Sequence, residues 1–409
     1  MKRVVITGVG AISPLGHDWA SVHARLRERR NAVRTMTEWD AYDGLNTRLG
    51  APAQPFELPA HYNRKSTRSM GRVALMATRA SEVALADAGL AGHPLVQDGR
   101  MGISYGSSVG SADAMGDFAR MFAEKTTEGI TATTYIRMMA HTAAVNIGVF
   151  LGVTGRVITT SSACTSGSQG IGYGFEAIRA GRQVAMLAGG ADELDASEAA
   201  VLDTLFATSM RNDQPGTTPR PFDVARDGLV IGEGACTLVL EELEHARARG
   251  ATILAEVIGY GTNSDGTHIT HPNARTMGVA MQLALDDAAL GPADIGYVNA
   301  HGTATDHGDV AETTATFGVF GKAVPISSLK SYMGHTLGAC GALEAWMTIE
   351  MMRSGWFAPT LNLEQVDPRC GALDYITGSG REIATEHVMS NNFAFGGINT
   401  SLIFRRWRE

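Results

Sequence analysis

A short helical pattern that occurs twice constrains the fold of this chain more than any other feature. Residues 84–90 (ALADAGL) return as residues 284–290 (ALDDAAL), and a short apolar run follows each copy. A second pair of similar segments occurs in the same order along the chain. Residues 176–181 and 350–355 each end a helical stretch with an arginine and a closing glycine. Two echoes in one order indicate a duplicated protein.

The elements of each half follow the pattern of α/β layers. Short apolar runs that end in glycine or serine alternate with helical stretches of roughly 12 to 20 residues, and no low-complexity linker divides them. We therefore predict an α/β fold with an N-terminal half over residues 1–250 and a C-terminal half over residues 251–409. The predicted strands include residues 3–7, 101–105, 157–160, 184–188, 236–240 and 295–299.

Composition narrows the class of protein. Hydrophobic residues make up 44% and charged residues 19% of the chain, as in globular proteins, and the net charge of −8 argues against a broad nucleic-acid-binding surface. The longest uncharged stretches, residues 138–155 and 157–175, are rich in glycine and hydroxyl residues, and the first apolar run is too short for a signal peptide. We expect a cytoplasmic protein without membrane insertion.

Cys164 is the candidate nucleophile. It lies where residues 157–181 pass from a strand through a tight turn into a helix, and the unpaired N–H groups at a helix start favour a thiolate. This position favours a thiol pKa below the usual value of about 8.5. The other three cysteines, Cys236, Cys340 and Cys370, lack this setting and are interpreted as buried side chains, with no disulfide framework or zinc ribbon.

The helix after Cys164 is unusually rich in glycine, although each interior glycine disfavours a helix by up to about 1 kcal/mol relative to alanine. Close approach by a second helix would compensate, and the helix after His335 also has small residues, with Gly338 and Gly341. We expect these two helices to pack at the centre of the molecule. Their N-termini would then bring Cys164 and His335 to one site.

Further polar groups follow apolar runs. His301 comes after the predicted strand 295–299, and His335 also follows an apolar run, so both imidazoles are expected beyond strand ends, where ligands of α/β sheets usually bind. Near the C-terminus, residues 391–399 include Phe395 and two glycines, a turn whose N–H groups would hold an oxyanion. Together with Cys164, these groups predict nucleophilic catalysis.

One pattern suggests a different class of enzyme. Gly8 and Gly10 follow the first strand, as in a dinucleotide-binding dehydrogenase. Ser13 takes the position of the third glycine, and no acidic residue stands at the distance expected for binding the ribose. The dehydrogenase is therefore the weaker alternative.

Two other clusters have both a functional and a structural interpretation. A polar loop would suit a metal ion, although a loop without metal explains it more simply; its residues are Asp265, His268 and His271. A compact basic cluster is either solvated surface or a docking site for an acidic partner; its residues are Arg64, Lys65 and Arg68.

Five motifs stand in a fixed order along the chain. They are ACTSG at residues 163–167, RDGLVIGEGA at 226–235, NAHGTAT at 299–305, SLKSYMGH at 328–335 and FGGIN at 395–399. In this order they resemble the elongating β-ketoacyl-acyl-carrier-protein synthases over nearly the whole chain. The resemblance implies the thiolase fold, a five-layered αβαβα arrangement of two pseudo-duplicated halves, and a homodimer.

The resemblance also implies a role for each central residue. Cys164 would take an acyl chain from the phosphopantetheine thioester of acyl carrier protein. His301 and His335 would hydrogen-bond the malonyl thioester while its carboxylate leaves. The N–H groups of Cys164 and Phe395 would form the oxyanion hole, and Phe395 would also gate the acyl pocket.

Other positions match supporting residues of the same family. Lys330 and Glu344 would hold the two histidines in place through their charges. The implied substrate-binding residues are Thr303, Thr305, Val109 and Asn399, and the implied surface for carrier-protein docking consists of Arg64, Lys65 and Arg68.

The implied reaction is the decarboxylative Claisen condensation of fatty-acid elongation, which gives a β-ketoacyl-carrier protein and needs neither a metal nor a redox cofactor. The same chemistry in a polyene or polyketide pathway is the alternative, because Asp306 and His307 replace the proline that usually follows this histidine motif. Acyl chain length, saturation, the identity of the carrier protein and the need for a second synthase-like subunit stay open.

Overall fold

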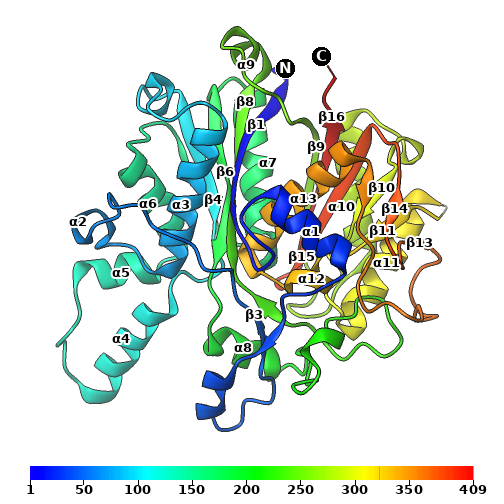
Figure 1. The fold of residues 1–409 in the computed structure, drawn as a ribbon, viewed down its shortest axis with the longest axis horizontal. Helices are drawn as coiled ribbons and strands as arrows, with labels where there is room; N and C mark the ends of the chain where they lie inside the picture. Colours follow the sequence, from blue (N-terminus) through cyan, green and yellow to red (C-terminus); the bar gives the residue numbers. More distant parts are fainter. Residues whose placement is uncertain (322, 409) are drawn as a thin grey trace.

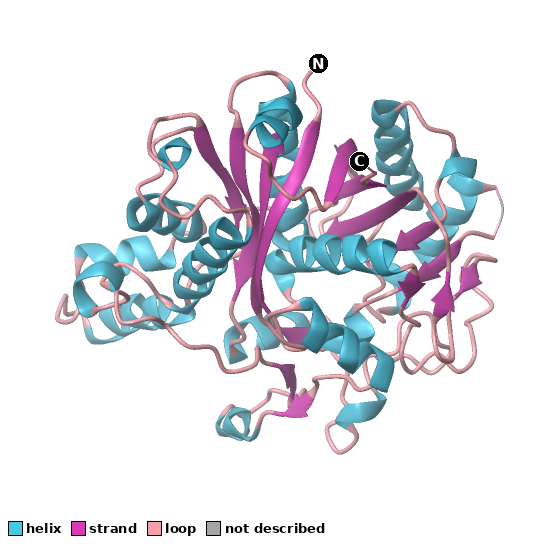
Figure 2. Ribbon diagram, turned by 45° about the horizontal axis from the view of Figure 1, so that its top comes forward, coloured by secondary structure: helices cyan, strands magenta, loops and turns pink. Residues whose placement is uncertain are grey.

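Helices and strands form a stack of five layers. The computed structural model describes residues 1–321 and 323–408. Two helices cover each outer face and two lie between the sheet halves, as the views in Figure 1 and Figure 2 show. In order across the stack they are α3 (Arg72–Asp87) with α6 (Thr142–Leu151), α7 (Ser166–Arg179) with α13 (Cys340–Ser354), and α10 (Ala274–Ala288) with α11 (Asp306–Phe320).

The strands form one continuous sheet that folds around the central helices. Their spatial order is β13 (Asp374–Tyr375), β11 (Pro325–Ser327), β10 (Tyr297–Asn299), β15 (His387–Ala394), β16 (Ile398–Arg406), β9 (Ala255–Ser264), β1 (Val4–Ile12), β8 (Gly234–Glu242), β6 (Ala185–Asp192), β4 (Met101–Gly106) and β5 (Val157–Thr160). All six strands predicted from apolar runs are confirmed within this sheet. The two sheet halves meet where β1 pairs antiparallel with the start of β9.

Shorter elements surround this stack. A small separate sheet contains β2 (Arg34–Thr35), β3 (Leu49–Ala51) and β7 (Ile231–Gly232), and a second contains β12 (Trp356–Phe357) and β14 (Arg381–Glu382). The remaining helices are α1 (Trp19–Glu28), α2 (Arg64–Thr67), α4 (Ala112–Glu124), α5 (Ala132–Met138), α8 (Ala196–Asp203), α9 (Leu243–Ala248) and α12 (Lys330–Met333). None of the helices described is long and apolar enough to cross a membrane.

Glycines of β1 serve the packing of an outer helix. A Cβ atom on Gly10 would lie 2.0 Å from the carbonyl oxygen of Ala80 in α3, so only glycine permits this close approach. The N–H of Val9, between Gly8 and Gly10, donates to the Asp87 carboxylate at the end of α3 over 2.9 Å. Because Gly8 and Gly10 lie inside a strand and not in a strand-to-helix turn, the dinucleotide-binding interpretation is wrong.

The C-terminal half contains the same close contact between a strand glycine and an outer helix. A Cβ atom on Gly261 of β9 would lie 2.0 Å from the carbonyl oxygen of Ala280 in α10, and the N–H of Tyr260 donates to Asp287 over 3.1 Å. The sequence echo at residues 84–90 and 284–290 therefore corresponds to two outer helices that pack in the same way on two equivalent strands. Residue 250 falls between α9 and β9.

The central helices α7 and α13 touch through their backbones. A Cβ atom on Gly167 would lie 2.8 Å from the carbonyl oxygen of Gly338, and one on Gly341 would lie 2.6 Å from the backbone nitrogen of Ser168. The predicted packing of the two glycine-rich helices is confirmed. Their N-terminal ends consequently lie together at the centre of the stack.

Enlarging this contact should destabilise the protein. In Gly341→Ala the new methyl group meets the backbone of α7, and we expect the free energy of unfolding to fall by about 1–3 kcal/mol, measured by thermal or urea unfolding. Gly318→Ala in α11 is the matched control, because nothing lies within 4 Å of its Cβ position and alanine favours the helix. Equal stability of the two variants would contradict the close contact.

Candidate active site

Cys164 lies in a tight turn between β5 and α7. The turn is the 3-10 segment Ala163–Thr165, and Ala163 adopts a left-handed conformation with φ of 49°, which is strained for a residue with a side chain. The Cys164 sulfur is 3.0 Å from Nε2 of His335. The turn therefore aims the thiol at the segment that precedes α13.

The surroundings of His335 determine which nitrogen carries its proton. The backbone N–H of Leu337 donates to His335 Nδ1 over 3.1 Å, so the neutral imidazole carries its hydrogen on Nε2. The backbone of His335 lies beside β7: its N–H donates to the carbonyl of Val230, just before this strand, over 2.7 Å. His335 thus presents an N–H donor to the sulfur of Cys164.

His301 has the same arrangement at the end of β10. Its Nδ1 is 3.1 Å from the ammonium nitrogen of Lys330, a group that only donates, so the hydrogen of this imidazole also lies on Nε2. The backbone N–H groups of His301 and Gly302 donate to Glu312 over 2.7 Å each and orient the turn. The rings of His301 and His335 are perpendicular, with centroids 5.1 Å apart.

A buried charge network lies behind the histidines. Lys330 pairs with Glu344 of α13, and Asn392 of β15 donates to the other carboxylate oxygen over 2.7 Å. Asn392 also approaches His301 Nδ1 at 3.4 Å and Cys340 at 3.6 Å. Residues 391–399 were expected to form a turn, but Asn392 lies inside β15 and the turn is confined to residues 395–397. The sequence does not single out Asn392, because its importance lies in its contacts.

The pKa of Cys164 differs from the one expected from the sequence. Burial raises the pKa of the Cys164 thiol to about 11, although Lys330 and the N–H groups of Phe395 and Cys164 act in the opposite direction. The prediction that the helix start gives Cys164 a depressed pKa is therefore wrong for the resting enzyme. Burial, reinforced by Lys330, lowers the pKa of His301 and of His335 well below the usual value. Both imidazoles are neutral near pH 7.

The turn after β15 completes the sulfur's surroundings. Gly396 and Gly397 both have positive φ, 89° and 71°, and the side chain of Phe395 is 37% exposed. The N–H of Phe395 nevertheless faces the Cys164 sulfur and contributes to its pKa. Asn399 is buried and donates to Asp265 over 2.7 Å, so it holds the turn and does not face the sulfur.

A cavity of about 660 Å³ connects the thiol to the surface. Cys164, His301, His335 and Phe395 line it, together with the predicted substrate-binding residues Val109, Thr303, Thr305 and Asn399. The hydroxyls of Thr303 and Thr305 are 2.9 Å apart. All of the residues predicted for the centre therefore lie on this cavity, except Lys330 and Glu344, which lie behind it.

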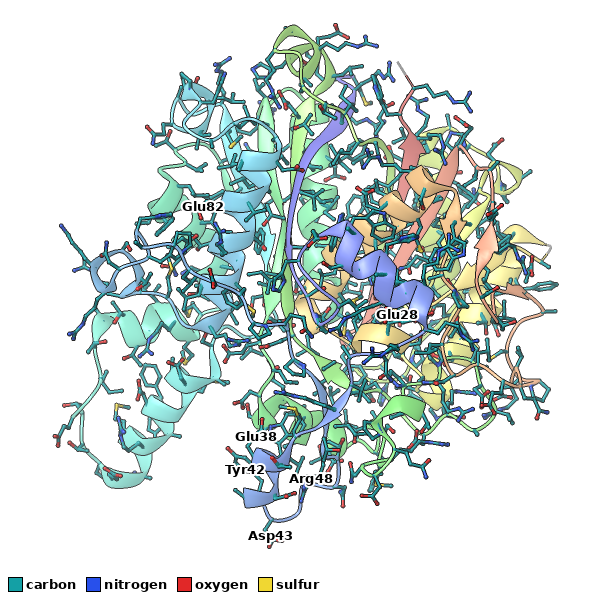
Figure 3. All side chains as sticks on the ribbon, in the orientation of Figure 1. Glu28, Glu38, Tyr42, Asp43, Arg48 and Glu82 are labelled. Carbon is teal, nitrogen blue, oxygen red and sulfur yellow. The ribbon has the colours of Figure 1, made fainter. Side chains whose placement is uncertain are left out.

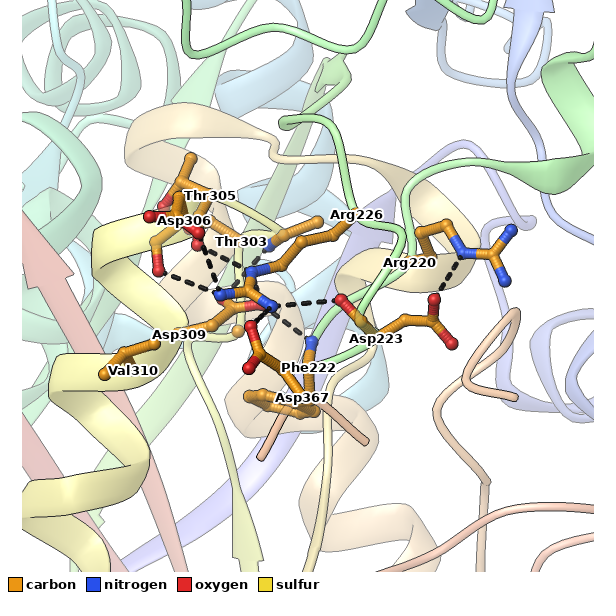
Figure 4. A network of polar contacts seen from close by, with 12 residues as sticks. Arg220, Phe222, Asp223, Arg226, Thr303, Thr305, Asp306, Asp309, Val310 and Asp367 are labelled. Atoms are coloured by element: carbon orange, nitrogen blue, oxygen red, sulfur yellow. Dashed lines mark hydrogen bonds and ion pairs between the residues drawn. The ribbon is translucent and has the colours of Figure 1, made fainter. Parts of the chain in front are cut away.

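An arginine network holds the mouth of the cavity. Arg226 donates to the carbonyl of Thr305 over 3.2 Å and to the carbonyl of Asp306 over 3.0 Å, and it pairs with Asp367 at 2.7 Å (Figure 4). Arg369 pairs with Asp306 from the other side. Asp306, which replaces the family's usual proline, is thus fixed by two arginines.

Two groups of side chains offer metal ligands at suitable distances within the residues described. They are Cys164 with His301 and His335, and His301 with Cys340 and Glu344. Both include His301, whose Nδ1 already accepts from the Lys330 ammonium, and this charge would repel a divalent cation. The loop residues Asp265, His268 and His271 do not form such a group, because the Asp265 carboxylate is bound by Asn399 and Thr276.

The basic cluster lies on α2 and on Arg68, the residue that ends this helix, and none of its residues lines the cavity. Asn63 caps this short helix, accepting from the N–H of Lys65 over 3.0 Å, and the side chains of Arg64, Lys65 and Arg68 are exposed. Glu82 of α3, labelled in Figure 3, accepts from Tyr62 over 3.2 Å and so anchors the segment before α2.

The pH dependence of thiol alkylation tests the raised pKa. We expect the rate constant for reaction of Cys164 with iodoacetamide to rise about tenfold per pH unit from pH 7 to 9.5, because the thiolate fraction rises tenfold per unit below the pKa. Peptide mass spectrometry separates Cys164 from the other three cysteines. A plateau below pH 8 would show a depressed pKa instead.

Comparison with known proteins identifies the family. The family models for the N-terminal and the C-terminal domain of β-ketoacyl synthases match residues 1–246 and 254–364. A 3-oxoacyl-[acyl-carrier-protein] synthase 2 of Synechocystis sp. is 37% identical over 419 residues, which cover 100% of this chain and 99% of the relative.

Solved structures agree with this match. The crystal structure of a β-ketoacyl synthase from Burkholderia phymatum STM815 is 62% identical with a TM-score of 0.98, over 100% of both chains. One chain of a solved structure that holds a type II PKS acyl-carrier protein in complex with its ketosynthase is 29% identical, with a TM-score of 0.89, also over 100% of both chains. The predicted thiolase-like fold is confirmed, and the chain belongs to the β-ketoacyl synthase family, with the elongating 3-oxoacyl-[acyl-carrier-protein] synthases among its relatives.

Proposed function

We propose that this protein condenses an acyl chain on Cys164 with malonyl-acyl-carrier protein in fatty-acid elongation. The observation that carries the proposal is the convergence of one thiol and two imidazoles of fixed tautomer on a single cavity. The name of the 37% identical relative supports the acyl-carrier protein as the source of both substrates.

In the first half-reaction the Cys164 sulfur attacks the carbonyl of the acyl thioester. The N–H groups of Cys164 and Phe395, which face the sulfur in the resting enzyme, stabilise the oxyanion of the tetrahedral intermediate. The bond to the phosphopantetheine sulfur then breaks, and the proton of the Cys164 thiol leaves with that sulfur. Because the thiolate is the nucleophilic form of cysteine, the proton must leave the Cys164 sulfur before or during the attack, and it ends on the leaving sulfur.

In the second half-reaction the malonyl thioester carbonyl accepts hydrogen bonds from Nε2–H of His301 and His335. These bonds stabilise the enolate that remains when the carboxylate leaves as carbon dioxide. The enolate carbon attacks the acyl-cysteine, a C–C bond forms, and the C–S bond to Cys164 breaks to return a thiolate that is then protonated. Neutral imidazoles suffice, since they donate hydrogen bonds and transfer no proton.

The remaining residues support these steps. Lys330 donates to His301 and so keeps its Nε2–H directed toward substrate, while Glu344 balances the buried ammonium charge. Thr303 and Thr305 line the mouth and bind the pantetheine arm, and Val109 lines the acyl pocket.

The acidic carrier protein docks on the exposed basic residues at α2.

The protein acts as a homodimer. Two features support the dimer: β5 is an edge strand of the described sheet, and apolar side chains near it are exposed, among them Val149 and Val157. Light scattering that gives the mass of one chain at micromolar concentration would rule out the dimer.

A specialised polyketide pathway is the second candidate. The 29% identical chain of the type II PKS ketosynthase complex supports it, because the likeness extends over the whole of both chains. The chemistry of the centre is the same in both pathways, so the difference lies in the acyl chain.

Single substitutions separate the two half-reactions. In Cys164→Ala we expect no acyl-enzyme and no condensation, while carbon dioxide release from malonyl-carrier protein persists; in His301→Ala we expect that release to fall at least about 100-fold. Mass spectrometry of the enzyme and capture of labelled carbon dioxide measure these outcomes. Cys370→Ala, at a buried thiol outside the cavity, is the control. Acylation of a residue other than Cys164 contradicts the assignment.

Charge reversal on α2 tests docking. Replacing Arg64, Lys65 and Arg68 by Glu should raise the KM for carrier protein about tenfold or more and weaken its salt dependence, with kcat nearly unchanged. The control replaces Arg30 and Arg34, exposed residues outside α2, by Glu. If both sets of variants behave alike, carrier protein docks elsewhere.

A further inference from the structure

One wall of the cavity contains an acid among apolar side chains. This wall, which we call the α8 wall, is formed by α8 and the turn that follows it, and its cavity-lining residues are Glu198, Val201, Leu202, Leu205 and Phe206. Apolar residues there suit an acyl chain. A carboxyl group in the same wall does not suit a plain hydrocarbon.

The Glu198 carboxyl has no partner in the part of the chain that the structure describes. Its Oε2 atom is buried, and none of the described residues donates a hydrogen bond to it. Four acids, Asp192, Glu193, Asp195 and Glu233, lie near enough to act on its charge. Burial together with these acids raises the pKa of Glu198 well above its usual value and so favours the protonated carboxyl, which both donates and accepts.

The neighbouring acids are occupied by donors of their own. Asp192 accepts from Ser107 over 2.7 Å, and Glu193 accepts from the N–H of Ala112 over 2.6 Å. Glu233 is bound by the guanidinium of Arg72 over 2.8 Å. No cation is therefore left in this group to pair with Glu198.

Asp195 caps α8 by accepting from the N–H of Ser197 over 2.8 Å, so it is not a partner either. Ser108, which lines the same cavity, lies against the Asp192 carboxylate and not against Glu198. A carboxyl group that none of the described residues pairs, in an otherwise apolar wall, indicates that the ligand supplies the missing hydrogen bond.

We propose that the α8 wall selects acyl chains that carry an oxygen substituent, a keto or hydroxyl group, and that Glu198 hydrogen-bonds this oxygen. The proposal rests on the condensation proposed above, and of its two candidate pathways it favours the second, in which the acyl chain keeps oxygen substituents. An all-hydrocarbon chain would displace water from Glu198 and leave it unpaired, whereas an oxygenated chain satisfies it. Glu198 is thus a specificity-determining residue that does not touch the reacting atoms.

Acylation of Cys164 by matched thioesters tests this. The probes are pantetheine thioesters of equal chain length in which one methylene at a time is replaced by a carbonyl or a hydroxyl-bearing carbon, and intact-protein mass spectrometry gives kcat/KM for acylation. We expect at least one oxygenated chain to react about tenfold faster than the hydrocarbon. Glu198→Leu should remove this preference, and Glu198→Gln, which keeps a donor and an acceptor, should retain it.

The controls separate specificity from folding. Ser197→Ala changes the exposed side of the same helical turn and should keep the wild-type preference. Glu198→Met, which keeps the length of the side chain, provides a second test if Glu198→Leu does not fold, and it should also remove the preference. A wild-type enzyme that reacts fastest with the hydrocarbon, or a preference unchanged in Glu198→Leu, overturns the proposal. Failure of every thioester to acylate Cys164 overturns the proposed function as well.

Discussion

The contact between α7 and α13 determines where the reacting groups lie. Backbone meets backbone at Gly167 and Gly338, so the distance between the helices is set by main-chain atoms and not by adjustable side chains. Cys164 stands just before α7 and His335 just before α13. Their separation of 3.0 Å is therefore a property of the helix contact, and a larger side chain anywhere along it changes the distance between nucleophile and hydrogen-bond donor.

The second constraint is the proton placement around the two imidazoles. A backbone N–H on one side and an ammonium group on the other leave each Nδ1 only the role of acceptor. Both Nε2–H groups consequently face the same cavity. The buried ammonium of Lys330 is stabilised by Glu344, whose other oxygen accepts from Asn392. A network of three elements thus maintains a proton arrangement that the histidines alone could not specify.

Much of this could be predicted from the sequence. The echo at residues 84–90 and 284–290 indicated the duplication, and the glycine-rich helices indicated the central contact, because periodicity and small residues report directly on packing. The pKa of Cys164 could not be predicted, since the helix start and burial act in opposite directions and only coordinates give the extent of burial. Asn392 and Glu198 were missed for a related reason: their importance lies in which groups surround them, and sequence spacing does not show this.

Gly8 and Gly10 illustrate the opposite error, because the same two glycines suit a phosphate loop and a close helix contact equally well until the strand is seen to continue through them.

Phe395 combines two tasks in separate parts of one residue. Its N–H is held toward the Cys164 sulfur by a turn of two left-handed glycines, whereas its side chain is partly exposed at the cavity. In the proposed reaction the amide stabilises the oxyanion, whereas the ring lines the cavity through which the acyl chain would pass. Evolution or protein engineering can therefore exchange the ring to admit other chains and leave the rate-enhancing amide in place, so that substrate range and turnover need not be traded against each other at this position.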